Sequence, residues 1–205
     1  MLITIEQAKQ IELRIEQLET RTDAEIVCVV SSRCDDYYYI PALWAAIVAL
    51  ISPLPFWFTP WWHQTTYVVL AQMVAFVAAW GLFRSPKVLI HFIPKDVRQW
   101  RASNLAKRSF LENKLHHTAN RKGVLLFVAE AEKYVEIFAD EGIAKLINDT
   151  QWESIIASLI EQIGQGRTYD GLQQCLEKCD ELLAKHAPAT SPKNELPNRL
   201  VMLNP

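Results

Sequence analysis

The sequence predicts an α/β fold, a small mixed β-sheet sandwiched by helices and interrupted by a two-helix transmembrane hairpin. Three observations support this prediction. Three short apolar runs are typical of buried strands. Several other segments repeat apolar residues at helical spacing. One long stretch, residues 37–83, contains no Lys, Arg, Asp or Glu. Strands with helices for both faces indicate a layered α/β domain.

The uncharged stretch divides into two apolar blocks, Ile40–Phe58 and Thr66–Phe83. Each block is about long enough to cross a hydrocarbon core of roughly 30 Å as a helix. The alternative is a buried hairpin of a soluble protein, which would need a larger domain to cover it. Pro53 and Pro55 disturb the first block, so its helix is expected to kink or to end there.

Positive charge in the short flanks predicts the orientation of the hairpin. The connecting segment, TPWWHQT, has no Lys or Arg, whereas basic residues lie on both outer sides. These are Arg21 and Arg33 upstream, and Arg84, Lys87, Lys95, Arg98 and Arg101 downstream. We therefore expect a multi-pass protein of the bacterial inner (plasma) membrane with both termini in the cytoplasm. Trp57, Trp61 and Trp62 would lie at the outer interface.

Before the hairpin, the sequence predicts one helix and one strand. Thr4 and Gln7 have the spacing of a capping box, which predicts a helix over residues 5–20. The β-branched run Ala24–Ser31 then indicates a buried strand.

After the hairpin, a helix is expected near Lys95–Leu115, with Pro94 in its first turn. The apolar runs Gly123–Ala129 and Tyr134–Ala139 predict two strands that form a hairpin.

Two further helices are predicted near the end of the chain. Thr150, with Asp149 as a competing cap, starts the first, and Gly164 and Gly166 end it. Asp170 is the expected cap of the last helix.

The expected organisation is a single soluble domain split by the hairpin. Residues 1–36 supply its first helix and strand, 37–86 form the hairpin, 87–187 complete the domain, and 188–205 are a flexible tail. The first strand must pair with strands roughly 90 residues later, and closing a free loop of that length costs about 4 kcal/mol. A hairpin that returns to the same membrane surface removes much of that cost.

Composition and motifs exclude several classes of function. A net charge of -2 argues against general nucleic-acid binding, which needs a basic surface. The four cysteines, Cys28, Cys34, Cys175 and Cys179, lack zinc spacing and are interpreted as free thiols. The sequence has no nucleophile elbow, phosphate-binding loop or HExxH motif, so no catalytic residue is predicted.

Acidic residues at the opening of the first strand and around the turn after the last strand suggest a calcium or magnesium site. Asp140, Glu141 and Asp149 follow the last predicted strand, and Asp23 and Glu25 open the first one. The alternative is structural, with Asp149 as a helix cap, Asp140 in a turn and Glu141 in solvent.

The helix after the hairpin carries a basic side made of Lys95, Arg98, Arg101, Lys107 and Arg108. Near an anionic leaflet each charge contributes about 1 kcal/mol of attraction, and Trp100 could anchor the helix at the interface. A docking site for an acidic protein and a simple positive-inside flank are the alternatives.

Three segments together resemble the TPM domain family, also called the TPM phosphatase domain: TDAEIVCVVS, NRKGVLLFVAEAEKYVEIFADEGI and GRTYDGLQQCLEKCDELL. The resemblance covers residues 1–32 and 95–186. It implies an α/β/α sandwich, with divalent cations or acid phosphatase activity in some members and assembly, repair or accessory roles in others. In ADEGIAKLIND, only Gly142 and Asp149 clearly match the family pattern, and Ala144 stands at the family glutamate.

We therefore expect an integral membrane protein with a cytoplasmic TPM-like domain that acts in binding or assembly, with dependence on Ca²⁺ or Mg²⁺ left open. Its expected partners are the lipid bilayer and a membrane protein, and nucleic acid is not among them. A metal-dependent acid phosphatase is the alternative. A transport accessory subunit is disfavoured, because the hairpin has no charged residue inside the membrane and offers only the polar side chain of Gln72.

Overall fold

The structure is a computed structural model and describes residues 3–58, 65–190 and 200–203. The chain divides into two units, Met1–Cys34 with Gln99–Pro205, and Asp35–Arg98. The second unit contains the whole uncharged stretch, residues 37–83, and is inserted in the sequence between two parts of the first.

The first unit is built on a four-stranded mixed sheet in the order β3-β2-β1-β4. Its central strands, β1 (Glu25–Ser31) and β2 (Gly123–Ala129), are parallel and pair Glu25 with Gly123. β3 (Tyr134–Ala139) runs antiparallel to β2, as the predicted hairpin requires. The prediction that the first strand pairs with a strand from beyond the hairpin is confirmed.

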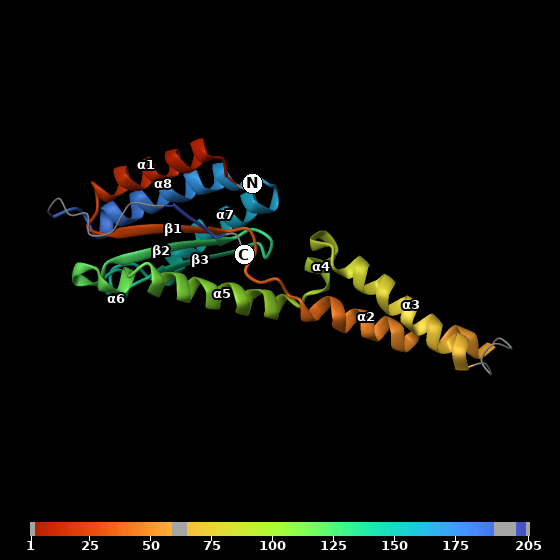
Figure 1. Cartoon of the computed structure of the whole chain (residues 1–205). Helices are drawn as coiled ribbons and strands as arrows, with labels where there is room; N and C mark the ends of the chain where they lie inside the picture. The colour runs from red at the N-terminus through yellow and green to blue at the C-terminus, as the bar shows by residue number, and fades with distance from the viewer. Residues whose placement is uncertain (1–2, 59–64, 191–199, 204–205) are drawn as a thin grey trace. The chain divides into compact units, whose positions relative to one another are not determined.

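Helices cover both faces of this sheet (Figure 1). Ile26 and Cys28 of β1 share a core with α1 (Ile5–Glu19), α7 (Asp149–Gly164) and α8 (Thr168–His186). Val27 and Val29 face the other way and pack with Ala102, Ala106 and Phe110 of α5 (Lys95–Glu112). Because both faces are covered, residues Ile26–Val30 of β1 form an unbroken apolar run with no alternation of polar residues. The predicted α/β fold is confirmed.

The helix starts agree with the sequence in part. Thr4 and Gln7 form the predicted capping box of α1. Helix α7 is capped by Asn148, whose N–H donates to Gln151 Oε1, so neither Thr150 nor Asp149 is the cap. Asp170 is not a cap either, because α8 already begins at Thr168 and Asp170 lies in its first turn.

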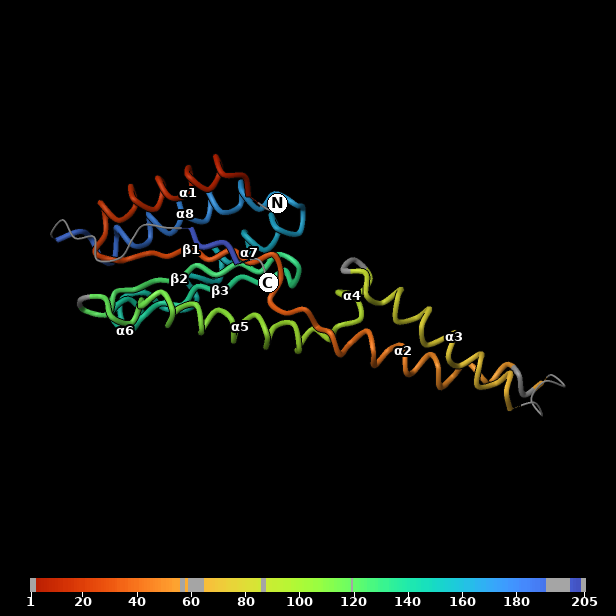
Figure 2. The backbone as a smooth tube through the Cα atoms, viewed as in Figure 1, coloured from red at the N-terminus to blue at the C-terminus, as the bar shows by residue number. Residues whose placement is uncertain are grey.

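The end of the chain contributes a strand that the sequence did not predict. Residues 188–205 were expected to form a tail, but β4 (Leu200–Leu203) pairs in parallel with β1. The backbone trace in Figure 2 shows this last strand beside β1. Its backbone hydrogen bonds cover the outer edge of β1, which would otherwise expose unpaired backbone groups.

The second unit contains α2 (Tyr39–Ile51), η1 (Leu54–Phe58), α3 (Thr65–Phe83) and α4 (Pro86–Phe92). Ala45 of α2 packs with Ala79 and Phe83 of α3, which makes the two helices an antiparallel pair. The Trp44 Nε1–H donates to the Phe92 carbonyl oxygen at 3.2 Å and ties α2 to α4.

The first apolar block is not one α-helix from Ile40 to Phe58. Helix α2 ends at Ile51, before Pro53, and a 3-10 turn follows from Leu54. Proline has no N–H to continue the helical hydrogen bonds and clashes with the preceding turn. The connecting residues 59–64, with Trp61, Trp62 and His63, lie outside the described residues.

Candidate functional site

Four of the five predicted acidic residues lie at one edge of the sheet. Asp23 and Glu25 stand at the start of β1, and Asp140 and Glu141 follow the end of β3. Since β2 is parallel to β1 and antiparallel to β3, the start of β1 and the end of β3 meet at the same edge. The Asp140 N–H donates to the carbonyl of Gly123, which pairs with Glu25.

Two consecutive cations separate these carboxylates. Arg121 contacts Asp140 at 3.1 Å and Glu141 at 2.7 Å. Lys122 contacts Asp23 at 2.9 Å. We call these five residues the sheet-edge cluster. Arg121 and Lys122 were not predicted as site residues. They directly precede β2, and Asp23 precedes its partner strand β1, so the opposite charges at the two strand starts were a signal in the sequence.

The cluster lowers the pKa of two of its carboxylates, Asp23 and Glu141. Partial desolvation raises the pKa of Asp23, but hydrogen bonds from Thr190 and from Lys122 outweigh it and lower the pKa to about 2. The Asp23 oxygens accept from the Thr190 N–H and hydroxyl, each at 2.8 Å. The Lys145 ammonium, with Arg121, lowers the pKa of Glu141. Each carboxylate is therefore neutralised by a neighbouring cation.

This arrangement does not fit the shared calcium or magnesium site that the sequence suggested. Asp149 begins α7, and Glu25 is buried in β1. Within residues 3–58, 65–190 and 200–203, no group of three or more His, Cys, Asp or Glu side chains could hold a metal ion. A calcium ion needs six to eight oxygens, and here Arg121 lies between the carboxylates of Asp140 and Glu141.

Close backbone contacts fix the position of Arg121. Asn120 and Arg121 have φ values of 60° and 54°, in the left-handed region that non-glycine residues rarely adopt. A Cβ on Gly142 would lie 2.2 Å from the Asn120 carbonyl oxygen and 2.6 Å from that of Arg121. Glycine at 142 thus allows α6 (Glu141–Ala144) to touch this turn, which brings Glu141 beside Arg121.

A buried carboxyl group lies where α1 ends and β1 begins. Glu19 Oε1 accepts from the Ile26 N–H at 2.9 Å, while Oε2 is buried with no hydrogen-bond partner among the described residues. Burial raises the pKa of Glu19 from 4.5 to about 8, and the nearby charges of Glu25 and Glu16 add to this. Glu19 is therefore protonated in the folded protein at neutral pH.

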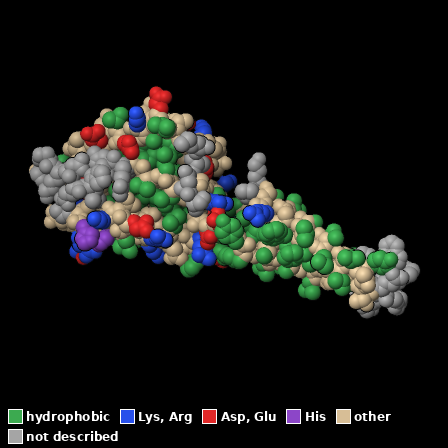
Figure 3. Space-filling model, viewed as in Figure 1, with side chains coloured by type: hydrophobic (Ala, Val, Ile, Leu, Met, Phe, Trp, Pro, Cys, Tyr) green, Lys and Arg blue, Asp and Glu red, His purple; other side chains and the backbone are tan. Residues whose placement is uncertain are grey.

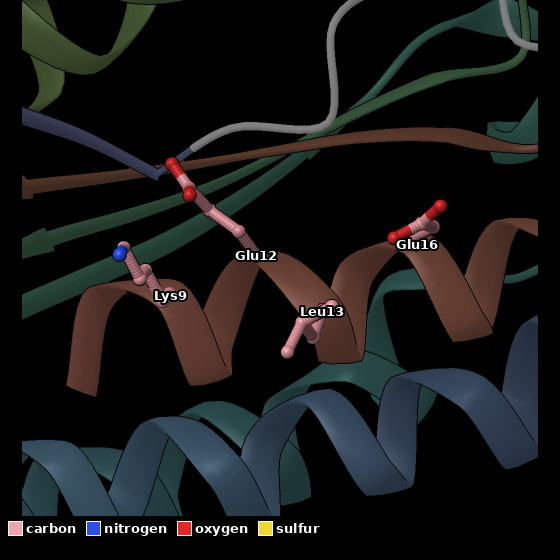
Figure 4. A pocket seen from close by; sticks show the side chains of 4 residues that line it. All are labelled: Lys9, Glu12, Leu13 and Glu16. Atoms are coloured by element: carbon pink, nitrogen blue, oxygen red, sulfur yellow. The ribbon is translucent and has the colours of Figure 1, made fainter. Parts of the chain in front are cut away.

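A surface hollow beside α1 contains a glutamate that contacts β4. It has a volume of about 330 Å³ and is lined by Lys9, Glu12, Leu13 and Glu16. In Figure 4, Glu12 and Glu16 extend to the same side of the helix. Glu12 Oε1 accepts from the Leu200 N–H at 3.4 Å, so it helps to hold β4 in place.

The most distinctive surface belongs to α2 and α3. Large apolar side chains on both helices are exposed, and we call them the hairpin surface. On α2 they include Leu43, Ile47, Val48, Leu50 and Ile51, and on α3 they include Tyr67, Val69, Leu70, Met73, Val74, Phe76, Val77, Trp80 and Leu82. Figure 3 shows these helices covered by hydrophobic side chains. An exposed apolar surface of this extent marks a membrane or protein interface.

One described helix has the length and composition of a membrane span. Helix α3 has 19 residues. Its most apolar 18-residue stretch has a mean hydropathy of 1.8, and only 11% of that stretch is buried. A core helix of a soluble protein would be mostly buried. Helix α2 is apolar but has 13 residues, which is too short for the same assignment. The two-helix transmembrane hairpin is therefore not established by the structure.

Helix α5 presents a mixed outward face. Trp100 and Leu111 are 60% and 57% exposed, with Lys107 and Arg108 exposed between them. The Arg101 guanidinium lies 5.0 Å from the centre of the Trp100 ring, within cation–π distance. Basic and apolar side chains thus share the exposed side of this helix.

Comparison with known proteins supports the same fold. Residues 83–182 match the family model of the TPM domain. The NMR structure of the BA42 protein from the psychrophilic bacterium Bizionia argentinensis is similar, with a TM-score of 0.60 and 20% sequence identity. The alignment covers 98% of this chain and 94% of that one. The comparison with curated proteins found no match. At this identity the structural neighbour shows the fold alone, and the family match shows that the chain carries a TPM domain over residues 83–182.

Proposed function

We propose that the protein is an integral protein of the bacterial inner membrane whose α2–α3 hairpin holds a cytoplasmic TPM domain at the bilayer. The domain would act there in binding or assembly. The observation that carries this proposal is the hairpin surface, which exposes large apolar side chains on two packed helices without a charged residue from Tyr37 to Phe83.

The energetic argument favours lipid over water around these helices. A large aliphatic or aromatic side chain gains about 1.5–3 kcal/mol when it leaves water. Val74 is 68% exposed, Met73 62% and Leu70 52%. Several such residues together make an aqueous hairpin unfavourable, whereas the hydrocarbon core removes this penalty without any conformational change.

Length and charge support two crossings with both ends in the cytoplasm. Helix α3 alone has the length of a span. Helix α2 and η1 together have residues for about 30 Å, at roughly 1.5 Å per α-helical and 2.0 Å per 3-10 residue. The flanking residues Arg33 and Arg84 are basic, and the connecting segment has no Lys or Arg, as the positive-inside rule requires.

The face of α5 supports a role at the membrane surface. Lys107 and Arg108 can attract anionic headgroups, and Trp100 suits the depth of the interface. Eleven residues separate α3 from α5 along the chain. No specific observation favours the phosphatase alternative, and we do not propose it.

Membrane fractionation with a matched pair of lysine variants tests the proposal. Val74→Lys places a charge on the hairpin surface, at a cost of about 3 kcal/mol in mid-bilayer. Leu13→Lys changes a similarly exposed residue of α1. We expect wild type and Leu13→Lys to stay in the membrane after alkaline carbonate extraction, and Val74→Lys to be partly released. Full release of the wild-type protein would refute the proposal.

A further inference from the structure

A groove on the hairpin surface contains an unsatisfied polar group. The groove has a volume of about 420 Å³ between α2 and α3, and its walls include Ala46, Ala49 and Leu50, and Gln72, Met73 and Phe76. Gln72 is the one polar side chain in this lining. Its amide makes no hydrogen bond with any residue in the described part of the chain.

An unpaired amide is costly in a membrane. A primary amide that leaves water without a hydrogen-bond partner loses several kcal/mol, because hydrocarbon offers no substitute. Glutamines in spanning helices commonly bond to a neighbouring helix for this reason. The groove therefore needs an occupant that is apolar along its length and carries a hydrogen-bonding group near Gln72.

The shape of the groove admits another helix. Ala46 and Ala49 lie on one wall and have the smallest side chains there, so they allow a close approach of a second backbone. The other wall offers Met73 and Phe76, which can adapt to a neighbour or pack on it. No charged residue lines the groove, so a charged partner segment would be left unpaired.

We propose that a second copy of this chain docks its own hairpin in this groove, with the two Gln72 amides hydrogen-bonded to each other. A primary amide carries both donors and an acceptor, so two amides related by a two-fold axis satisfy each other. The same hairpin also meets the other requirements, since it is uncharged and has small residues at the contact. A two-fold pair of identical surfaces closes on itself and forms a dimer.

This inference rests on the proposed membrane insertion, and a cross-linking experiment separates the two. Ala49→Cys places a thiol in the groove and keeps Gln72. Val74→Cys is the matched control, because Val74 is exposed on α3 but does not line the groove. Both variants are made with Cys34→Ser, since Cys34 is partly accessible and the other cysteines are buried. Membranes are oxidised with copper phenanthroline, and the products are sized without reductant.

We expect a disulfide-linked dimer from Ala49→Cys and little from Val74→Cys. Adding Gln72→Leu to the Ala49→Cys variant should lower the dimer association constant about tenfold, as measured by dilution into excess lipid. Equal cross-linking of the two cysteine variants, cross-linking of neither, or no effect of Gln72→Leu would refute the dimer and leave lipid or another helix as the occupant. Fractionation of the same samples reports insertion separately, so a dimer failure in membrane-inserted protein leaves the anchoring proposal intact.

Discussion

The Lys122 ammonium lies 2.9 Å from the Asp23 carboxylate, and this contact joins the residue directly before β2 to the residue two positions before β1. Both side chains are mostly buried, at 21% and 11% exposure. The pair therefore links the two central strands at the edge where both begin. In the sequence, its two residues lie on opposite sides of the long insertion.

Replacing Lys122 should destabilise the fold mainly above pH 4. The pKa of Asp23 is lowered from 3.8 to about 2, so its contribution is complete above 3.8 and disappears as the pH falls to about 2. We expect Lys122→Met to lose about 1–2 kcal/mol at pH 7 and much less at pH 2. Unfolding of the detergent-solubilised protein, followed by circular dichroism, measures this. Lys185→Met on α8, which has no ion pair in the described residues, is the control, and equal losses at both pH values would contradict the account.

Gly142→Ala should destabilise the protein strongly. Its Cβ would meet two backbone carbonyl oxygens at 2.2 and 2.6 Å, and backbone cannot yield as a flexible side chain can. We expect a loss of about 2–3 kcal/mol, or roughly 5–10 °C in Tm.

Gly164→Ala is the matched control, because nothing lies within 4 Å of the added methyl group at the end of α7. It should be neutral or slightly stabilising, since alanine favours a helix over glycine. Similar melting temperatures for the two variants would show that α6 does not touch the turn at Asn120.

Glu19→Gln should remove a pH dependence of stability. Glu19 has a pKa of about 8 in the folded protein against 4.5 when unfolded, so the folded state holds its proton more tightly. The contribution of Glu19 to the free energy of unfolding should therefore be complete below pH 4.5. It should be lost as the pH rises from 4.5 to 8.

Thermal unfolding between pH 5 and pH 8.5 measures the effect. The melting curve of Glu19→Gln should change less over this range than that of the wild type. Glu6→Gln, an exposed residue in the first turn of α1, should behave as the wild type. If Glu19→Gln and the wild type show the same pH dependence, Glu19 is ionised or solvated in the fold.

The sequence predicted the parts of the fold that rest on local pattern. The apolar runs of β1, β2 and β3 and the Thr4–Gln7 capping box were recognised because burial and capping act over a few residues. β4 was missed because four residues among proline and polar neighbours give no periodicity, and only the open edge of β1 makes them a strand.

The candidate site was harder to predict. The common location of Asp23 and Asp140 follows from strand order, but the two cations between them depend on left-handed residues at Asn120 and Arg121. Such backbone conformations are set by tertiary contacts, here the close approach of Gly142. The sequence therefore located the acidic edge but did not show that its charges are already paired.

Thiol labelling of the connecting segment is the sharpest test of whether the α2–α3 hairpin crosses the membrane twice. His63→Cys, in the segment between α2 and α3, is compared with Glu177→Cys on the exposed side of α8, both with Cys34→Ser. A membrane-impermeant maleimide is added to intact spheroplasts and, separately, to inside-out vesicles. The account predicts that His63→Cys is labelled only in spheroplasts and Glu177→Cys only in vesicles. Labelling of both cysteines from the same side would contradict a hairpin that crosses the membrane twice.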